Sequence, residues 1–241
     1  MKSQTVQSRK PSLGKKIGWA FMLLLAAFPV LISSGYLTMN PDNFNFAEQK
    51  MVYMAHITIL MVHIVASMLA ILIGPFQFLP GIRKGRFLKF HRWLGRTYLL
   101  SVLFGGLGGL YMAQLAYGGT ISRLGFSVLA CLWLYTGLRA YKHIRNREIA
   151  QHRQWMIRNY ALTFAGVMLR VWVPLSSVAG IDFLMAYRTI AWLCWIPDLI
   201  VAQWIISRMR RSQPRSWIVD RLGMPGSEQK SVQMDFSKPG D

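Results

Sequence analysis

Residues 52–79 read VYMAHITILMVHIVASMLAILIGPFQFL, a long run without a single Lys, Arg, Asp or Glu. About 20 apolar residues in a helix, each adding about 1.5 Å, span the hydrocarbon core of a bilayer. This run is therefore long enough to cross a membrane, and five further apolar segments share that property. The predicted spans are residues 17–38, 52–79, 93–117, 121–142, 154–179 and 189–207. The sequence predicts an all-α, polytopic membrane bundle of six helices, with residues 1–207 in a single membrane-embedded domain.

The charged residues of the chain are few, and most of them are basic. The 241 residues include 28 Lys and Arg against 9 Asp and Glu, a formal net charge of +19, although 53% of the residues are apolar. A chain this apolar lacks the polar surface over which a soluble protein would spread such charge, and it is too rich in Trp, Phe and Leu to be disordered. Its two cysteines exclude a disulfide scaffold. Because the basic residues flank the spans and form no continuous patch, nucleic acid is not an expected partner.

Lys and Arg concentrate in alternate connections between the spans. Segments 1–16, 81–97, 139–158 and 208–241 hold 5, 6, 6 and 7 of them, 24 of the 28. Positively charged short loops stay in the cytoplasm, so we predict that both termini are cytoplasmic. The basic flanks are expected to contact anionic lipid headgroups, and residues 208–241 to form a basic, mobile cytoplasmic tail. The remaining loops hold Lys50, Arg123, Arg188, Asp42, Glu48 and Asp182.

Two similar motifs open the third and fifth spans. Residues 91–98 read HRWLGRTY, and residues 152–160 read HRQWMIRNY. Both motifs begin with His-Arg and end with Arg-x-Tyr, and a basic turn precedes each. This similarity predicts a parallel repeat of two hairpins, spans two and three matching spans four and five, unless so short a match arose by chance. In such a repeat His91 and His152 occupy equivalent places at one depth.

The two motif histidines could serve as axial ligands on opposite sides of one heme b. Guanidinium groups bind carboxylates and phosphates with two parallel hydrogen bonds, so the nearby arginines suit heme propionates. The alternative is that His-Arg at a helix start anchors the chain to lipid headgroups, as interfacial Arg commonly does. The predicted cofactor-binding residues are His91, His152, Arg92, Arg96, Arg153 and Arg158.

Three ionisable residues lie deep within predicted spans. Counting about 1.5 Å per residue from the span ends places His63, Arg170 and Asp198 at one level. A charge at that depth is costly, so these residues are expected to face one another or a water-filled cavity. We predict an Arg170–Asp198 ion pair with His63 close by, acting either as a relay for a proton, quinone or substrate or as a structural clasp.

Three motifs in order resemble a known family. Residues 74–78 read GPFQF, and they are followed by the motif at residues 91–98 and by the motif from residue 152, which continues to Arg170. Over residues 56–200 the chain resembles domain-of-unknown-function family 2306, multi-pass proteins of bacterial membranes. The resemblance implies the cytoplasmic membrane and the span count, and it implies no activity. The polar positions that it points to are His63, Gln77, His91, Arg92, Arg96, His152, Arg153, Trp155, Arg158 and Arg170.

The sequence leaves three functions open. The first is a redox protein that binds heme b or a quinone. In membrane b-type cytochromes a histidine pair on one span holds two hemes, and no span of this sequence carries such a pair. The one expected heme site is therefore His91 with His152. The second is a small proton-coupled transporter in which Asp198 carries the proton. The third is a non-catalytic membrane subunit or scaffold, alone, as a homo-oligomer or with another membrane protein. The sequence does not decide whether the protein is an enzyme.

Overall fold

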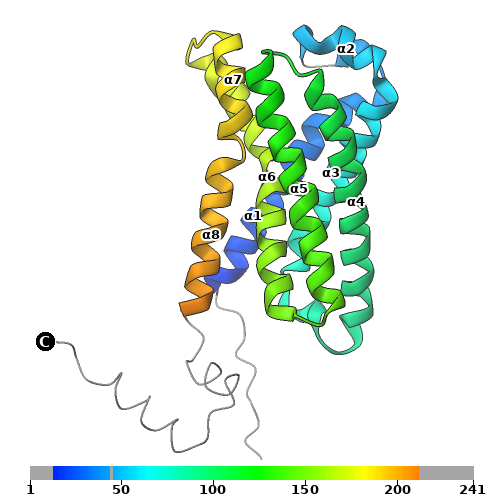
Figure 1. Ribbon diagram of the computed structural model, residues 1–241, viewed down its shortest axis with the longest axis vertical. Helices are drawn as coiled ribbons and strands as arrows, with labels where there is room; N and C mark the ends of the chain where they lie inside the picture. Colours follow the sequence, from blue (N-terminus) through cyan, green and yellow to red (C-terminus); the bar gives the residue numbers. More distant parts are fainter. Residues whose placement is uncertain (1–12, 44–45, 212–241) are drawn as a thin grey trace, which may run out of the picture. The chain divides into compact units, whose positions relative to one another are not determined.

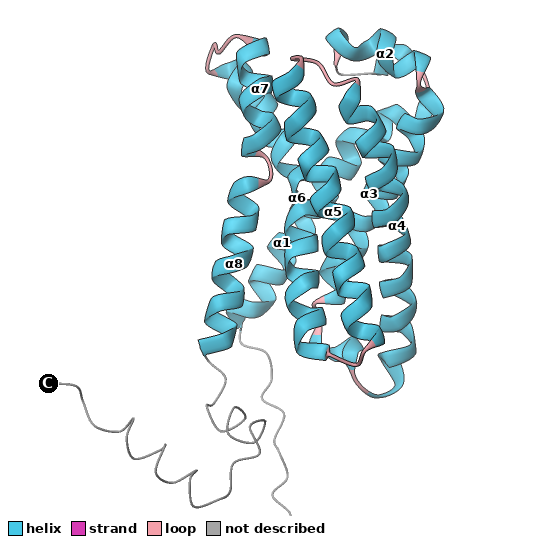
Figure 2. Ribbon diagram, in the orientation of Figure 1, coloured by secondary structure: helices cyan, strands magenta, loops and turns pink. Residues whose placement is uncertain are grey.

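The computed structural model describes residues 13–43 and 46–211, and this part of the chain consists of helices and short connections, without a strand (Figure 2). The all-helical fold class is therefore confirmed. The α-helices are α1 (Leu13–Ser33), α2 (Lys50–Ala55), α3 (Ile57–Gln77), α4 (Leu88–Gln114), α5 (Thr120–Arg145), α6 (Ile149–Val178), α7 (Phe183–Leu193) and α8 (Ile196–Arg211). Short 3-10 helices are η1 (Ser34–Thr38), η2 (Pro41–Asn43), η3 (Ala47–Gln49), η4 (Pro80–Arg83) and η5 (Gly85–Phe87).

Five segments of the described chain are long and apolar enough to cross a membrane. They are Ile17–Thr38, α3, α5, α6 and the segment Phe183–Arg211 that contains α7 and α8. Helix α4 has 27 residues but is not one of these five segments; charged residues occupy its first turns and glycines its middle. Its predicted crossing at residues 93–117 stays a prediction.

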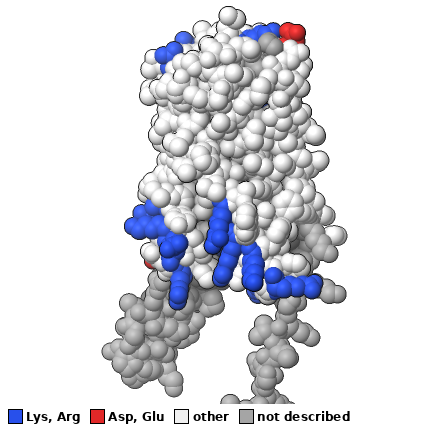
Figure 3. Space-filling model, turned by 90° about the vertical axis from the view of Figure 1, so that its right-hand side faces the viewer, with Lys and Arg blue, Asp and Glu red and all other residues white. Residues whose placement is uncertain are grey.

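Helices α3 to α6 lie side by side and alternate in direction (Figure 1). Helix α1 packs against α3 and α6, and α7 packs against α5 and α6. The connections 78–87 and 146–148 therefore share one end of the bundle, named here the basic end, and the connections 115–119 and 179–182 share the opposite end. Figure 3 shows Lys and Arg gathered at the basic end and a broad belt without charged residues above them. This separation of charge agrees with the segregation in the sequence.

Glycines allow α4 to approach its neighbours closely. Residues 105–109 read GGLGG, and small residues at such spacing favour close packing of membrane helices. A Cβ added to Gly106 would lie 2.6 Å from the side chain of Leu134 on α5, and one added to Gly109 would lie 2.9 Å from the ring of His63 on α3. The glycines thus let α4 pack between α3 and α5.

The Gly-Pro pair of α3 is the point where three helices meet. Proline has no N–H, so Pro75 leaves the carbonyl of Ile71, four residues earlier, without its usual helical partner. The hydroxyl of Tyr160 on α6 donates to that carbonyl at 3.2 Å, and its ring lies over Gly74. Trp19 on α1 donates through Nε1 to the carbonyl of Pro75 at 2.9 Å. The carbonyls of Ile71 and Pro75 are therefore the acceptors that connect α3 to α6 and α1.

A buried polar network joins α4, α5 and α6. Tyr98 donates to Asn159 Oδ1 at 2.7 Å, and Asn159 Nδ2 donates to the carbonyl of Trp133 at 2.8 Å and to Thr136 Oγ1 at 2.9 Å. The indole N–H of Trp133 donates to Thr163 Oγ1 at 2.8 Å. Because Tyr98 and Asn159 are fully buried, these bonds are needed to satisfy groups that water cannot reach.

Two predicted spans are broken helices. Residues 52–79 divide at His56 into α2 and α3. The last span starts at Phe183, earlier than the predicted residue 189. Asp182 is the N-cap there, and its side chain accepts a hydrogen bond from the backbone N–H of Met185 at 2.9 Å. Helices α7 and α8 are separated just before Pro197, which cannot continue the backbone ladder.

The chain divides after Ala202 into two units. In the second unit the structure describes only residues 203–211, which are helical. Of the tail predicted from residue 208, residues 212–241 lie outside the described part.

Candidate functional site

A cluster of polar side chains lies at the basic end. Gln77 is the last residue of α3, Arg83 ends η4, and His91 and His152 lie in the first turns of α4 and α6. A charge on Arg83 and a charge on His152 both act on His91, so each of these two groups lies within electrostatic range of His91. The two motif histidines thus lie within electrostatic range of each other. We name Gln77, Arg83, His91 and His152 the histidine cluster.

The protonation of His152 follows from its hydrogen bond. Its Nδ1 lies 2.9 Å from the backbone carbonyl of Ala140 on α5. A carbonyl oxygen can only accept, so Nδ1 carries the proton, and in the neutral ring Nε2 carries the lone pair. Metal-ligating histidines are commonly held by a hydrogen bond of this kind on the other ring nitrogen.

His91 lacks a hydrogen bond to any described residue. Its Nδ1 is buried and unpartnered, and so is Nε2 of Gln77. Gly95, one turn along α4, faces Gln77, since a Cβ there would lie 3.5 Å from Oε1. Burial, followed by the charges of Arg83, His152 and Arg92, lowers the pKa of His91. His91 is therefore neutral at neutral pH and offers a free lone pair.

The arginines of this end have different roles. Arg83 donates to the carbonyls of Leu79 and Phe78, both at 3.3 Å, and so supplies donors to two backbone acceptors that directly follow α3. Burial and the nearby charge of Arg153 lower the pKa of Arg83. Of the predicted arginines, Arg92 and Arg153 are exposed beside the histidine cluster.

The other two predicted arginines differ in position. Arg96 is exposed, and Arg158 lies 4.7 Å from the ring centroid of Trp155. Arg139 lies over the same ring at 5.1 Å, and the imidazole of His143 stacks on it. Arg158 thus belongs to a group of side chains that pack on the ring of Trp155. Sequence spacing did not predict this group, because Arg139 and His143 come from α5.

The deeper residues form a second cluster, and it differs from the predicted one. His63 Nδ1 donates to the carbonyl of Gly105 at 2.7 Å, which leaves Nε2 as an acceptor. Arg170 donates to the carbonyl of Gly166 at 2.8 Å and to the hydroxyl of Ser33 on α1. His63 lies within electrostatic range of Arg170.

Tyrosines and not a carboxylate face the buried Arg170. Tyr36 and Tyr53 lie within electrostatic range of its guanidinium. Among the described residues no ion pair joins Arg170 to Asp198, and Oδ2 of Asp198 is buried without a hydrogen-bond partner. The predicted pair is thus not formed, because α1 and the residues after it occupy the side of α6 that carries Arg170.

Metal sites built only from the protein are not evident in the described part of the chain. No group of three or more His, Cys, Asp or Glu residues there could hold an ion. Cys131 and Cys194 are both free thiols.

Comparison with known proteins bears on the family of this chain. Residues 60–206 match the family model described as predicted membrane protein (DUF2306), and this range runs from α3 into α8. No curated protein and no solved structure matched the chain. The match covers more than half of the 241 residues and includes both histidine motifs. The chain therefore belongs to the DUF2306 family of predicted membrane proteins.

Proposed function

We propose that this chain is a redox protein of the bacterial cytoplasmic membrane and binds one heme b between His91 and His152. The main support is the state of the two imidazoles. The Ala140 carbonyl holds the proton of His152 on Nδ1, and His91 is neutral because burial and the charge of Arg83 oppose its protonation. Both rings can then present a lone pair to iron, and a pair of neutral histidines is a common axial ligand set.

The residues around the histidines suit the charged edge of such a cofactor. Arg83 and Arg92 supply positive charge near His91, Arg153 supplies positive charge near Arg83, and guanidinium groups bind propionate carboxylates well. Gln77 Nε2 is a buried donor without an acceptor, which a propionate oxygen would satisfy. Bound heme would supply one-electron transfer, whereas the protein would orient the ligands and fix their protonation.

The second cluster supports a quinone as the redox partner. Arg170 can donate to a quinone oxygen, and His63 Nε2 can accept a proton that is released when the quinol is oxidised. The absorption spectrum of the protein purified in detergent from heme-replete cells tests the proposal. A Soret band is expected, and a colourless preparation would overturn it.

We further propose that the chain crosses the membrane six times, with α4 as the additional span. Helix α4 runs between the same two ends as α3 and α5 (Figure 1). The basic end faces the cytoplasm by the positive-inside rule, where it contacts anionic lipid headgroups. Six crossings then leave both termini on that side.

Cysteine labelling tests the α4 crossing. Lys84 and Thr120 are exposed and lie on either side of α4 in the sequence. In intact cells, with Cys131 and Cys194 replaced by serine, a membrane-impermeant maleimide is expected to label Thr120→Cys and not Lys84→Cys. Permeabilised cells should label both variants. Equal labelling of the two positions in intact cells would mean that α4 does not cross.

Proton-coupled transport is a second candidate, which Asp198 supports. Its Oδ2 is buried without a partner in the first turn of α8, directly after the break between α7 and α8. A carboxylate placed at a broken helix within a membrane is typical of proton-coupled transporters. If neither heme nor proton movement is found, the third function, a non-catalytic subunit or scaffold, is favoured.

A proton-flux assay tests the transport function. In vesicles with an imposed membrane potential, the wild type is expected to acidify the interior, and Asp198→Asn should slow this on the order of 100-fold because the proton acceptor is lost. Asp42→Asn is the control, since Asp42 is exposed and paired with Lys50 at 3.2 Å. Equal flux in the wild type and Asp198→Asn, or none above empty vesicles, would exclude this role for Asp198.

A further inference from the structure

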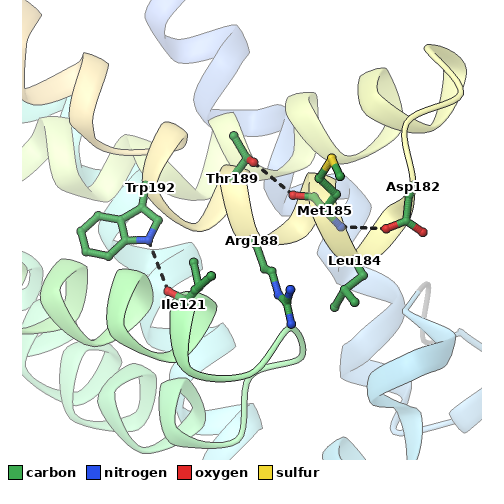
Figure 4. A pocket seen from close by; sticks show the side chains of 7 residues that line it. All are labelled: Ile121, Asp182, Leu184, Met185, Arg188, Thr189 and Trp192. Carbon is green, nitrogen blue, oxygen red and sulfur yellow. Dashed lines mark hydrogen bonds between the residues drawn. The ribbon is translucent and has the colours of Figure 1, made fainter.

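An open pocket lies at the end of the bundle opposite to the histidine cluster (Figure 4). Helix α7 forms one wall and the start of α5 the other, and its volume is about 560 Å³. Most of the lining is apolar, with one cationic and one anionic side chain. The lining residues are Ile121, Asp182, Leu184, Met185, Arg188, Thr189 and Trp192.

The cationic residue of the pocket is held in place and keeps free donors. Arg188 Nε donates to the carbonyl of Gly118 in the α4–α5 connection at 2.8 Å. Gly118 has a φ of +89°, and a Cβ there would lie 2.3 Å from Ser122 Oγ, so the connection requires glycine at this position. The terminal nitrogens of Arg188 make no hydrogen bond to a described residue, which leaves the fork of the guanidinium for a ligand.

The anionic residue of the pocket is also only partly used. One oxygen of Asp182 caps α7 by accepting from the backbone of Met185 at 2.9 Å. No ion pair within 4 Å joins Asp182 to Arg188 or to any other described residue. Six residues separate the two, which places them about 9 Å apart along the helix axis. The pocket thus presents two separated and opposite charges.

The apolar residues place the pocket at a membrane surface. Asp182 directly precedes the candidate span that starts at Phe183, and Ile121 lies in the first turn of the span formed by α5. Ile121 is 50% exposed and Met185 is 65% exposed. Trp192 lies deeper along α7 and donates to the carbonyl of Ile121 at 3.3 Å. The pocket thus has apolar residues on the side toward the membrane and charged residues at its outer edge. A lipid molecule at the membrane–water interface has its acyl chains and headgroup in the same order.

We infer that this pocket binds a zwitterionic phospholipid, with its phosphate against Arg188, its ammonium group against Asp182 and its acyl chains on the apolar residues. A purely anionic lipid fits less well because Asp182 would repel it, and a neutral lipid would leave both charges unpaired. A primary ammonium group also donates hydrogen bonds to the carboxylate, so phosphatidylethanolamine is favoured over a quaternary ammonium lipid.

Competition between lipids tests this inference. The protein in mild detergent is incubated with equal amounts of phosphatidylethanolamine and phosphatidylglycerol, and the bound lipids are counted by native mass spectrometry. We expect phosphatidylethanolamine to be retained preferentially. Arg188→Gln should lower total retention about fivefold, the size expected for one partly exposed charge contact. Asp182→Asn should remove the preference while asparagine still caps α7.

Matched variants separate binding from folding. Arg188→Lys keeps the charge and should retain lipid, and Arg123→Gln, an exposed cation on α5 outside the pocket lining, should change nothing. Two results would overturn the inference. One is an equal ratio of the two lipids on the wild type, and the other is a preference that survives in Asp182→Asn. Neither result depends on whether the protein binds heme.

Discussion

Replacing His152 by alanine is expected to abolish the Soret band of the purified protein. The substitution removes one of two axial ligands, and a single remaining imidazole would hold heme far more weakly because the pair binds from both sides of the iron. The heme content per protein should fall by more than 90%. Each tenfold fall in heme affinity corresponds to about 1.4 kcal/mol of binding free energy. Absorbance at the Soret maximum, divided by protein concentration, measures this directly.

Control variants show whether the loss reflects ligation. His91→Ala should have the same effect, because the two ligands act together. His56→Ala should leave the band unchanged, since His56 lies at the opposite end, where its Nδ1 is 3.0 Å from the hydroxyl of Tyr111. Added imidazole should restore part of the band in His152→Ala. A band that persists in both alanine variants would show that these histidines are not the ligands.

The spans were predictable because hydropathy and charge depend only on local sequence. The helix boundaries were less predictable. The sequence showed no helix end at His56, since Val52, Tyr53 and Met54 before it and Ile57, Ile59 and Leu60 after it continue the apolar pattern. Helix α7 begins at Phe183 because Asp182 caps it. A cap is visible in the sequence as an aspartate before an apolar run, so this start was within reach of sequence reasoning.

The candidate site was predictable only where a repeated motif carried it. His91 and His152 were expected near each other, and the structure places them within electrostatic range of each other. Arg83 was not predicted as a site residue, because its position depends on how η4 packs against α3 and α4. The error at Arg170 has a clear origin. Counting residues gives the depth of a side chain, but the direction in which it leaves the helix depends on rotation about the axis and on which helix lies there.

Of the glycine-to-alanine substitutions in the bundle, Gly74→Ala should lower the free energy of unfolding most. The new Cβ would lie 1.9 and 2.3 Å from ring carbons of Tyr160, distances at which atoms overlap. The ring cannot move away easily, since its hydroxyl is bonded to the carbonyl of Ile71 that Pro75 leaves free. Overpacking of a rigid core costs about 1–3 kcal/mol, and this position should lie at about 3 kcal/mol. Unfolding by SDS, followed by circular dichroism, measures the difference.

A matched glycine and a second background test the cause of that loss. Gly18 on α1 has no neighbouring atom within 4 Å of an added Cβ, so Gly18→Ala should be neutral or stabilise the helix by up to about 1 kcal/mol. In a Tyr160→Leu background the ring is gone, and Gly74→Ala should then cost almost nothing. A cost that is equal in both backgrounds would contradict the clash. If the cost vanishes with the ring, the family motif at residues 74–78 is explained by packing, because Gly74 makes room for Tyr160 and Pro75 supplies its acceptor.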